Sequence, residues 1–293
     1  MKKEISFSGR GQRADIGDMI IYRILPNRYT DAVGPFVFLD HIGPTFHSES
    51  EDEKKRGTGA HPHRGIATLT YVLNGEDEHF DSIGNHAKVG SGGVQWMKAG
   101  NGIIHDEHLI VDPNENSRLT HGLQFWINLP SKNKGESPEY IAIQSGEVPW
   151  KLLENQSGWI KVIAGDYENL NSIIPDYSKQ FLYHIHIEEG KQFVLTSESG
   201  MEYAAFLPLG KAVINGNEYN SGEFIEFDRN GGTIEINNLS SAASDILLFG
   251  GERYLEPIVA EGPFVMNSSP EIAQAYKDYF AGKYGEIKVS SGF

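Results

Sequence analysis

The motif HPHRG, residues 61–65, puts two imidazoles one residue apart at the start of a strand-like run, IATLTYVLNG. Alternate residues of a strand project to the same side, so His61 and His63 would lie about 7 Å apart at the backbone on one face. Rings placed in this way can converge on one metal ion at about 2.0–2.1 Å. An HxH pair alone is a weak signal, so the rest of the chain must supply further ligands.

A second pair with the same spacing occurs in GNGIIHDEHL, residues 100–109, where His105 and Glu107 lie two residues apart. On a strand beside the first pair, they would complete a set of three nitrogens and one carboxylate oxygen. That set suits iron, manganese, nickel, copper or zinc, and on an octahedral ion it would leave two positions open. The chain contains no cysteine, which excludes thiolate ligands and a cysteine nucleophile.

Other polar residues near these motifs have simpler explanations. No HxE motif follows the pair His184 and His186 in YHIHIEEG, so we expect both rings on one face of a strand without a metal. His108 has the opposite strand parity from Glu107 and is predicted not to be a ligand. Two roles are open to Arg64: it orients a ligand carboxylate or an anionic substrate, or it is a surface turn residue.

The segments between the two pairs also carry polar and aromatic side chains. Gln95, Trp96 and Met97 are predicted to pack inside the β-structure, with a role in a pocket wall as the alternative. His79 and Asp81 in EHFDS are predicted to be exposed or hydrogen-bonded turn residues.

The elements that must position these residues are short β-type runs. IIYRILP, GPFVFLDHIG, ATLTYVLNG, GGVQWMKAG, HGLQFWINLP and GWIKVIAGDY each end in turn residues. This pattern predicts a sandwich or barrel, and a second Gly-punctuated series indicates a duplicated β-domain. The polar segment 131–140 is the predicted linker, so we expect domains at 1–132 and 140–293.

One segment near the carboxyl end, SSPEIAQAYKDYFAGKYG, predicts a helix. Ser269 can cap it, Pro270 suits its first position, and Gly282 follows its last turn. Its apolar residues recur at helical spacing and would pack on a β-domain.

Composition limits the classes of partner. The 293 residues carry a formal charge of −15, which argues against a general nucleic-acid or anionic-membrane binder. The first residues have no apolar core of a secretory signal, and no run reaches the roughly 18 apolar residues of a membrane helix. We therefore expect a cytoplasmic protein.

Several motifs together resemble the pirin family: HPHRG followed by TYVLNG, DSIGNHAKVGSGGVQWMKAGNGIIHDE, HGLQFWINLP and EPIVAEGPFVMN. The resemblance implies an all-β fold of two cupin (jelly-roll barrel) domains with a C-terminal helix. It also implies a metal in the first domain, bound by His61, His63, His105 and Glu107, and none in the second. Many pirins have Glu where this chain has Ala67, which puts the charge around the ligands in doubt but not the ligands themselves.

The resemblance further implies an activity. Several pirins are quercetin 2,3-dioxygenases, which use O2 to open the central ring of a flavonol and release carbon monoxide. Glu107 would then be the catalytic base for the substrate's enol proton. The expected cofactor is one divalent metal, Fe(II) first, with Ni, Cu, Mn, Co or Zn as alternatives. The expected partners are a flavonol-like substrate and O2, without direct nucleic-acid or membrane contact, and the chain is expected to be a monomer.

Two other functions fit the same motifs. Some pirins are metal-containing, redox-sensing co-regulators that bind a transcription factor or a metabolic enzyme. A sugar-binding or isomerase cupin is the third hypothesis, and it would be indifferent to oxygen.

Overall fold

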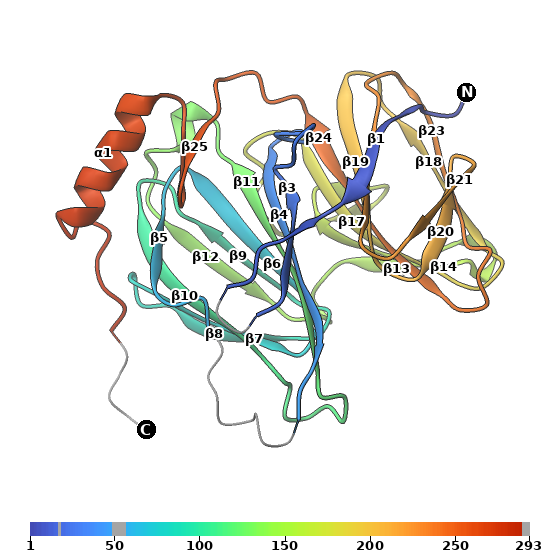
Figure 1. The fold of residues 1–293 in the computed structure, drawn as a ribbon, viewed down its shortest axis with the longest axis horizontal. Helices are drawn as coiled ribbons and strands as arrows, with labels where there is room; N and C mark the ends of the chain where they lie inside the picture. Colours follow the sequence, from blue (N-terminus) through green and yellow to red (C-terminus); the bar gives the residue numbers. More distant parts are fainter. Residues whose placement is uncertain (17–18, 49–56, 289–293) are drawn as a thin grey trace. The chain divides into compact units, whose positions relative to one another are not determined.

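The computed structural model describes residues 1–16, 19–48 and 57–288, and most of its regular structure is β-strand (Figure 1). The chain forms two compact units. One, called the His61 unit here, comprises Arg13–Tyr22, Ile42–Glu147 and Leu255–Phe293. The other, called the His184 unit, comprises Met1–Gln12, Arg23–His41 and Val148–Tyr254.

These units differ from the predicted domains, 1–132 and 140–293, at both ends of the chain. The first strand, β1 (Ile5–Arg10), pairs with β22 (Glu223–Phe227) in the His184 unit. The C-terminal helix belongs to the His61 unit instead of the second half of the chain. The amphipathic pattern of a terminal segment shows that its apolar face must be buried. It does not show against which sheet that face packs. The division into separately folding domains at 132 and 140 stays a prediction.

The His61 unit is built on a larger and a smaller antiparallel sheet. The larger has the order β12-β9-β6-β11-β4-β3-β2, and the chain passes between the units within β2, β3 and β4. Its strands are β2 (Gln12–Arg13), β3 (Ile21–Leu25), β4 (Phe36–Phe46), β6 (Ile66–Asn74), β9 (Val94–Lys98), β11 (Leu119–Asn128) and β12 (Glu139–Ile143). The smaller has the order β5-β10-β7-β8. Its strands are β5 (His61–His63), β7 (Glu76–Asp81), β8 (His86–Gly90) and β10 (Ile103–Ile110).

The segment 131–140, which is the predicted linker, is partly in regular secondary structure and partly buried in the His61 unit. A short 3-10 helix (Ser131–Asn133) is followed by Lys134, whose side chain is buried. Its ammonium donates to the backbone carbonyls of Gly65 and Val265 at 2.7 and 2.8 Å. Burial lowers the pKa of Lys134 to about 7. The segment's polar composition therefore serves buried hydrogen bonds of the His61 unit, a role that composition alone does not distinguish from solvation.

The His184 unit repeats the arrangement of a larger and a smaller sheet. Their orders are β1-β22-β19-β24-β17-β14-β13 and β18-β23-β20-β21, and a hairpin, β15-β16, is added. The larger sheet contains β13 (Trp150–Leu152), β14 (Gly158–Ala164), β17 (Gln180–Ile187), β19 (Met201–Leu209) and β24 (Ser244–Glu252) besides β1 and β22. The remaining strands are β15 (Asp166–Tyr167), β16 (Leu170–Asn171), β18 (Gln192–Ser197), β20 (Lys211–Ile214), β21 (Asn217–Asn220) and β23 (Gly232–Asn237).

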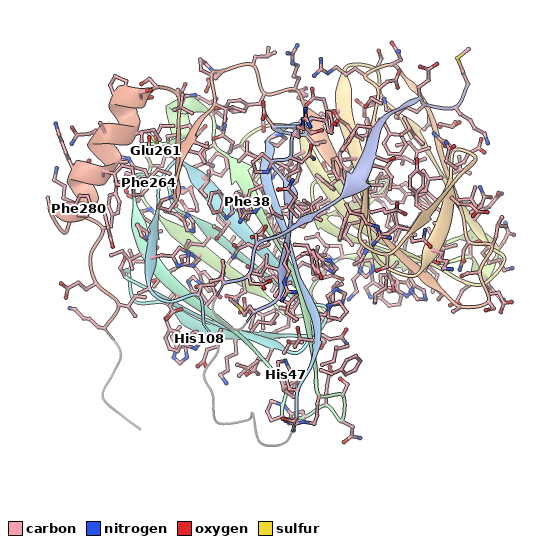
Figure 2. The ribbon with its side chains drawn as sticks, in the orientation of Figure 1. Phe38, His47, His108, Glu261, Phe264 and Phe280 are labelled. Carbon is pink, nitrogen blue, oxygen red and sulfur yellow. The ribbon has the colours of Figure 1, made fainter. Side chains whose placement is uncertain are left out.

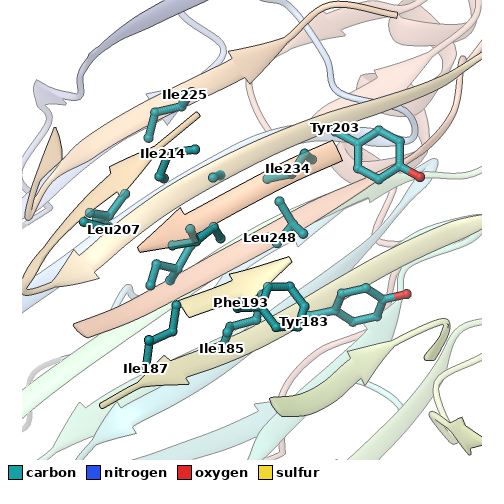
Figure 3. Packing of buried hydrophobic residues seen from close by; sticks show 14 of the residues in the cluster. Tyr183, Ile185, Ile187, Phe193, Tyr203, Leu207, Ile214, Ile225, Ile234 and Leu248 are labelled. Atoms are coloured by element: carbon teal, nitrogen blue, oxygen red, sulfur yellow. The ribbon is translucent and has the colours of Figure 1, made fainter. Parts of the chain in front are cut away.

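Strand alternation explains which side chains form the core of the His184 unit. Along β17, Tyr183, Ile185 and Ile187 enter a cluster with residues such as Leu248 of β24 (Figure 3). The residues between them, which include His184 and His186, project to the other face of the strand. The predicted placement of this histidine pair on one strand face is confirmed.

The predicted helix is present as α1 (Ser269–Phe280), and it packs against the hairpin β25 (Val259–Glu261) and β26 (Phe264–Met266) (Figure 1). Its cap is Ser268, one residue before the predicted Ser269. The apolar side chains Ile272 and Ala275 are buried, as their spacing predicted. Within the described part of the chain, no helix is long and apolar enough to cross a membrane.

Candidate metal centre

Strand β10 carries two of the predicted site residues. Buried and half-buried positions alternate along IIHDEHLI, so that His105 and Glu107 are buried on one face and Asp106 and His108 lie on the other. His108 (Figure 2) is 3.1 Å from Asp106 and outside both groups of converging donors among the described residues. The structure therefore confirms the predicted alternation, with His105 and Glu107 on one face of the strand and His108 on the other.

Strand β5 brings the HxH pair to the same place. It pairs with β10 so that His61 lies opposite His105. The Nε2 atom of His61 is 3.1 Å from the Nε2 atom of His63 and 3.1 Å from that of His105. Two nitrogen ligands at about 2.1 Å from an ion and at a right angle to it would be about 3.0 Å apart. Both distances from His61 Nε2 thus match those between neighbouring positions on one metal ion.

The opposite edges of these rings determine where their protons lie. His63 Nδ1 donates to the carbonyl of Pro263 at 3.0 Å, and His61 Nδ1 donates to the carbonyl of Gly59 at 2.7 Å. A carbonyl can only accept, so both Nδ1 atoms carry the hydrogen and both Nε2 atoms present lone pairs. Hydrogen bonding of the outer nitrogen is what orients a metal-bound histidine in proteins.

Electrostatics favours a bound cation over a shared proton. Burial and the charge of nearby His61 lower the pKa of His63 to about 3. Burial also lowers the pKa of His105 well below its usual value. At neutral pH these rings are therefore uncharged, and the lone pairs of His61 and His63 are available to a positive ion. The donor set therefore fits a divalent transition metal.

Glu107, the predicted fourth ligand, lies on the other side of the His105 ring. Its Oε1 accepts a hydrogen bond from Thr70 at 3.2 Å, and its Oε2 accepts one from Gln124 at 2.5 Å. The same Oε1 is 3.9 Å from His105 Nδ1, whereas the Nε2 atom of that ring faces His61. The structure brings the three predicted histidines together and places Glu107 in a second group with His105 and His79.

His79 is the site residue that sequence reasoning missed, because EHFDS was interpreted as a turn. It is fully buried in β7, and its ring stacks on Tyr140 with centroids 4.2 Å apart. His79 Nε2 lies 3.2 Å from Asp81, and its Nδ1 is 3.8 Å from Glu107. Burial alone would lower the pKa of His79, but hydrogen bonding to Asp81 and the charge of Glu107 outweigh it and raise the pKa to about 9.

His79 and Asp81 lie in strand β7, so their predicted location in a turn is wrong. The predicted hydrogen bonding of both side chains is confirmed. The signal that could have corrected it is the alternation in EDEHFD, where Asp77, His79 and Asp81 occupy one face. A charged residue at every second position resembles a solvated strand unless the neighbouring strands are known.

The remaining candidates have structural roles. Gln95, Trp96 and Met97 are buried in β9, as predicted for packing. The guanidinium of Arg64 lies 2.7 Å from Asp278 of helix α1, an ion pair that neither predicted role included. Ala67 is buried in β6, and nothing in the structure explains the change from the Glu of many pirins.

Two units, each with a larger and a smaller antiparallel sheet, and converging histidines in one of them define a protein of two cupin domains. Comparison with known families supports this: the pirin model matches residues 19–127, and the model of the pirin C-terminal cupin domain matches residues 182–285. The chain belongs to the pirin family.

Individual relatives show how far the similarity extends. A Pseudomonas aeruginosa protein named "putative quercetin 2,3-dioxygenase" is 33% identical over 97% of this chain and 99% of its own length. Pirin-1 of Arabidopsis thaliana is 36% identical over 77% of each chain. A crystal structure of quercetin 2,3-dioxygenase from Acinetobacter baumannii is 29% identical in sequence and has a TM-score of 0.90. The match covers 98% of this chain and 100% of the crystallised chain.

Proposed function

We propose that this protein is a metal-dependent dioxygenase of the pirin type, which uses O2 to open the central ring of a flavonol such as quercetin. Both oxygen atoms enter the ring-opened ester, and one ring carbon leaves as carbon monoxide. The convergence of three imidazole nitrogens, with His61 Nε2 3.1 Å from Nε2 of both His63 and His105, carries the proposal. The names of the P. aeruginosa relative and of the A. baumannii structure support the substrate class.

His61, His63 and His105 are the proposed metal ligands, each through Nε2. Glu107 is the proposed fourth ligand, and its carboxylate also accepts hydrogen bonds from Thr70 and Gln124. A divalent transition ion, with Fe(II) as the expected one, supplies Lewis acidity and one-electron chemistry with O2 when it is bound.

Glu107 is also the proposed base for the flavonol enol. Its carboxylate lies on the buried face of β10, in the second group of donors with His105 and His79. Gln124 and Thr70 each donate a hydrogen bond to it, which holds the carboxylate in one orientation. A base already held in place accepts a proton without first ordering its own side chain.

The test is aerobic turnover of quercetin by protein purified without oxygen and loaded with Fe(II). We expect loss of the flavonol absorbance together with release of carbon monoxide, both abolished by a chelator. The matched control is His184→Ala with His186→Ala, which removes an HxH pair of the same spacing and should retain turnover. Metal-loaded protein that shows no oxygen-dependent turnover would contradict the proposal and favour the metal-containing co-regulator.

A further inference from the structure

The segment EPIVAEGPFVMN takes no part in the proposed chemistry, yet it contacts a proposed ligand. Strands β25 and β26 pair Glu261 with Phe264, which leaves Gly262 and Pro263 as a two-residue turn. Gly262 has a φ of +56°, and glycine at the first central position of a two-residue hairpin loop is typical of a type II′ turn. This turn presents the Pro263 carbonyl to His63 Nδ1 at 3.0 Å, from 200 residues away in the sequence.

The turn is fixed to the backbone directly after the ligand. Val265 N–H donates to the carbonyl of Arg64 at 3.2 Å, and Arg64 forms an isolated parallel bridge with Phe264. At Gly65, whose φ is +82°, an added Cβ would lie 2.0 Å from the Val265 carbonyl oxygen. The strand that ends at His63 and the strand that begins at Phe264 therefore lie in direct backbone contact.

Helix α1 and the residues after it also contact Arg64, the residue that follows the ligand His63. The Arg64 guanidinium donates to Asp278 at 2.7 Å and to the Tyr284 hydroxyl at 3.3 Å. The Tyr284 hydroxyl in turn donates to the Ala275 carbonyl at 2.8 Å, inside the helix. Asp278 and Tyr284 thus connect the helix to the residue that follows the ligand.

Tyr284 also reaches the second ligand strand. Its ring packs so closely on Gly102 that an added Cβ there would lie 2.1 Å from a ring carbon. It belongs to an apolar cluster with Phe264 and Ile272, against which Ile104 of β10 packs. Figure 2 shows Glu261 and Phe264 beside helix α1. One C-terminal segment consequently holds the ends of both β5 and β10, which carry the three histidines.

We propose that the C-terminal clamp, defined as the Gly262–Pro263 turn together with Asp278 and Tyr284, is a positioning part of the metal centre. The inference rests on the metal site of the proposed function. The clamp acts through the Pro263 carbonyl, which keeps the proton of His63 on Nδ1 and its lone pair on Nε2. Loss of an outer hydrogen-bond partner of a metal ligand typically weakens metal binding by about 10–100-fold.

Gly262→Ala tests the turn, since the new Cβ would lie 2.7 Å from the Tyr276 hydroxyl and φ is in the left-handed region. Gly282→Ala is its matched control, because Gly282 has a φ of +72° on the same segment but open space around it. Asp278→Asn tests the link to Arg64 without a change of size. Lys277→Ala, an exposed neighbour on the helix, is the control for that variant.

The measurement is the affinity of metal-free protein for Co(II), determined by competition with a chelator, beside the Co(II) absorption spectrum and the melting temperature without metal. We expect Gly262→Ala and Asp278→Asn to bind Co(II) about 10-fold or more weakly with an altered spectrum, and the controls to match the parent. A merely structural role would lower the melting temperature and leave the affinity and the spectrum unchanged.

The outcomes separate the two proposals. A parent that binds no Co(II) would overturn the metal site and with it the proposed function. A parent that binds Co(II), with Asp278→Asn and a folded Gly262→Ala protein binding equally tightly, would overturn the clamp alone. Asp278→Asn keeps the test decisive if Gly262→Ala does not fold.

Discussion

Two HxH pairs lie on strands of this protein, and the residue across from each pair gives it a different chemistry. In the His61 unit, His61 pairs across the sheet with His105. In the His184 unit, His186 pairs across the sheet with Asp245 of β24. The i, i+2 spacing puts two rings on one strand face in both places, and the register of the neighbouring strand supplies either a third imidazole or a carboxylate.

The consequence is visible in the hydrogen bonds. His184 Nε2 and His186 Nδ1 both contact the same oxygen of Asp245, at 3.0 and 2.7 Å. Trp159 covers the pair, and its ring is stacked on that of His186. A carboxylate accepts the ring N–H groups here, whereas in the His61 pair backbone carbonyls accept them and the lone pairs converge. An HxH motif thus favours metal binding when two conditions hold. One ring nitrogen of each histidine donates its hydrogen to a backbone carbonyl, and the other ring nitrogen faces a further uncharged imidazole.

The largest expected effect comes from removing one converging nitrogen. His61→Ala or His105→Ala should lower the metal content to near background, because each removes one of three converging Nε2 donors, of which that of His61 lies 3.1 Å from the other two. The β-structure should remain. Elemental analysis beside circular dichroism checks both points, and full metal occupancy in either variant would refute the ligand assignment.

Glu107→Gln should affect catalysis much more than occupancy. Three imidazoles remain to hold the ion, but an amide cannot accept the enol proton, and loss of a general base typically costs about 10²–10⁴ in rate. The quantity to compare is turnover of quercetin per bound metal. Parent-like activity per metal would show that the proton leaves by another route.

Asp245→Asn should destabilise the His184 unit without changing the metal content. Burial alone would raise the pKa of Asp245, but hydrogen bonds from His184 and His186 outweigh it and lower the pKa. Hydrogen bonds to a charged group contribute about 1.5–3 kcal/mol each, so we expect a loss of that order in the free energy of unfolding at pH 7.

The pH dependence of this loss has a definite sign. A carboxyl whose folded-state pKa is lowered contributes stability that is present above its unfolded pKa of about 3.9 and disappears as the pH falls through the folded value. The difference between parent and Asp245→Asn should therefore shrink below about pH 4. Urea unfolding at pH 7 and in acid measures it, and equal stability at pH 7 would contradict the role given to the carboxylate.

The smallest expected effect is that of His184→Ala with His186→Ala on metal stoichiometry. Both rings already contact Asp245, and among the described residues neither belongs to a group of converging donors. Metal per chain should stay at the parent value in elemental analysis. A drop by one equivalent would reveal a second site and remove the contrast between the two pairs.

Local patterns predicted much of the site. The alternation in IIHDEHLI places His105 and Glu107 on one buried face, and the HPH motif places its two rings together. The capping residues, the proline and the apolar spacing of SSPEIAQAYKDYF predicted the helix to within one residue. Each of these properties depends on neighbours within a few positions, which the sequence displays directly.

The sequence by itself determined which side chains share a strand face, because that depends only on the two-residue period of a β-strand. Only the tertiary structure decided what each face meets. It placed His105 across from His61, Asp245 across from His186, and the Pro263 carbonyl on His63. Strand register and the return of a distant segment are set by packing over the whole unit, so the partner that gives each histidine its chemistry is absent from the histidine's own stretch of sequence.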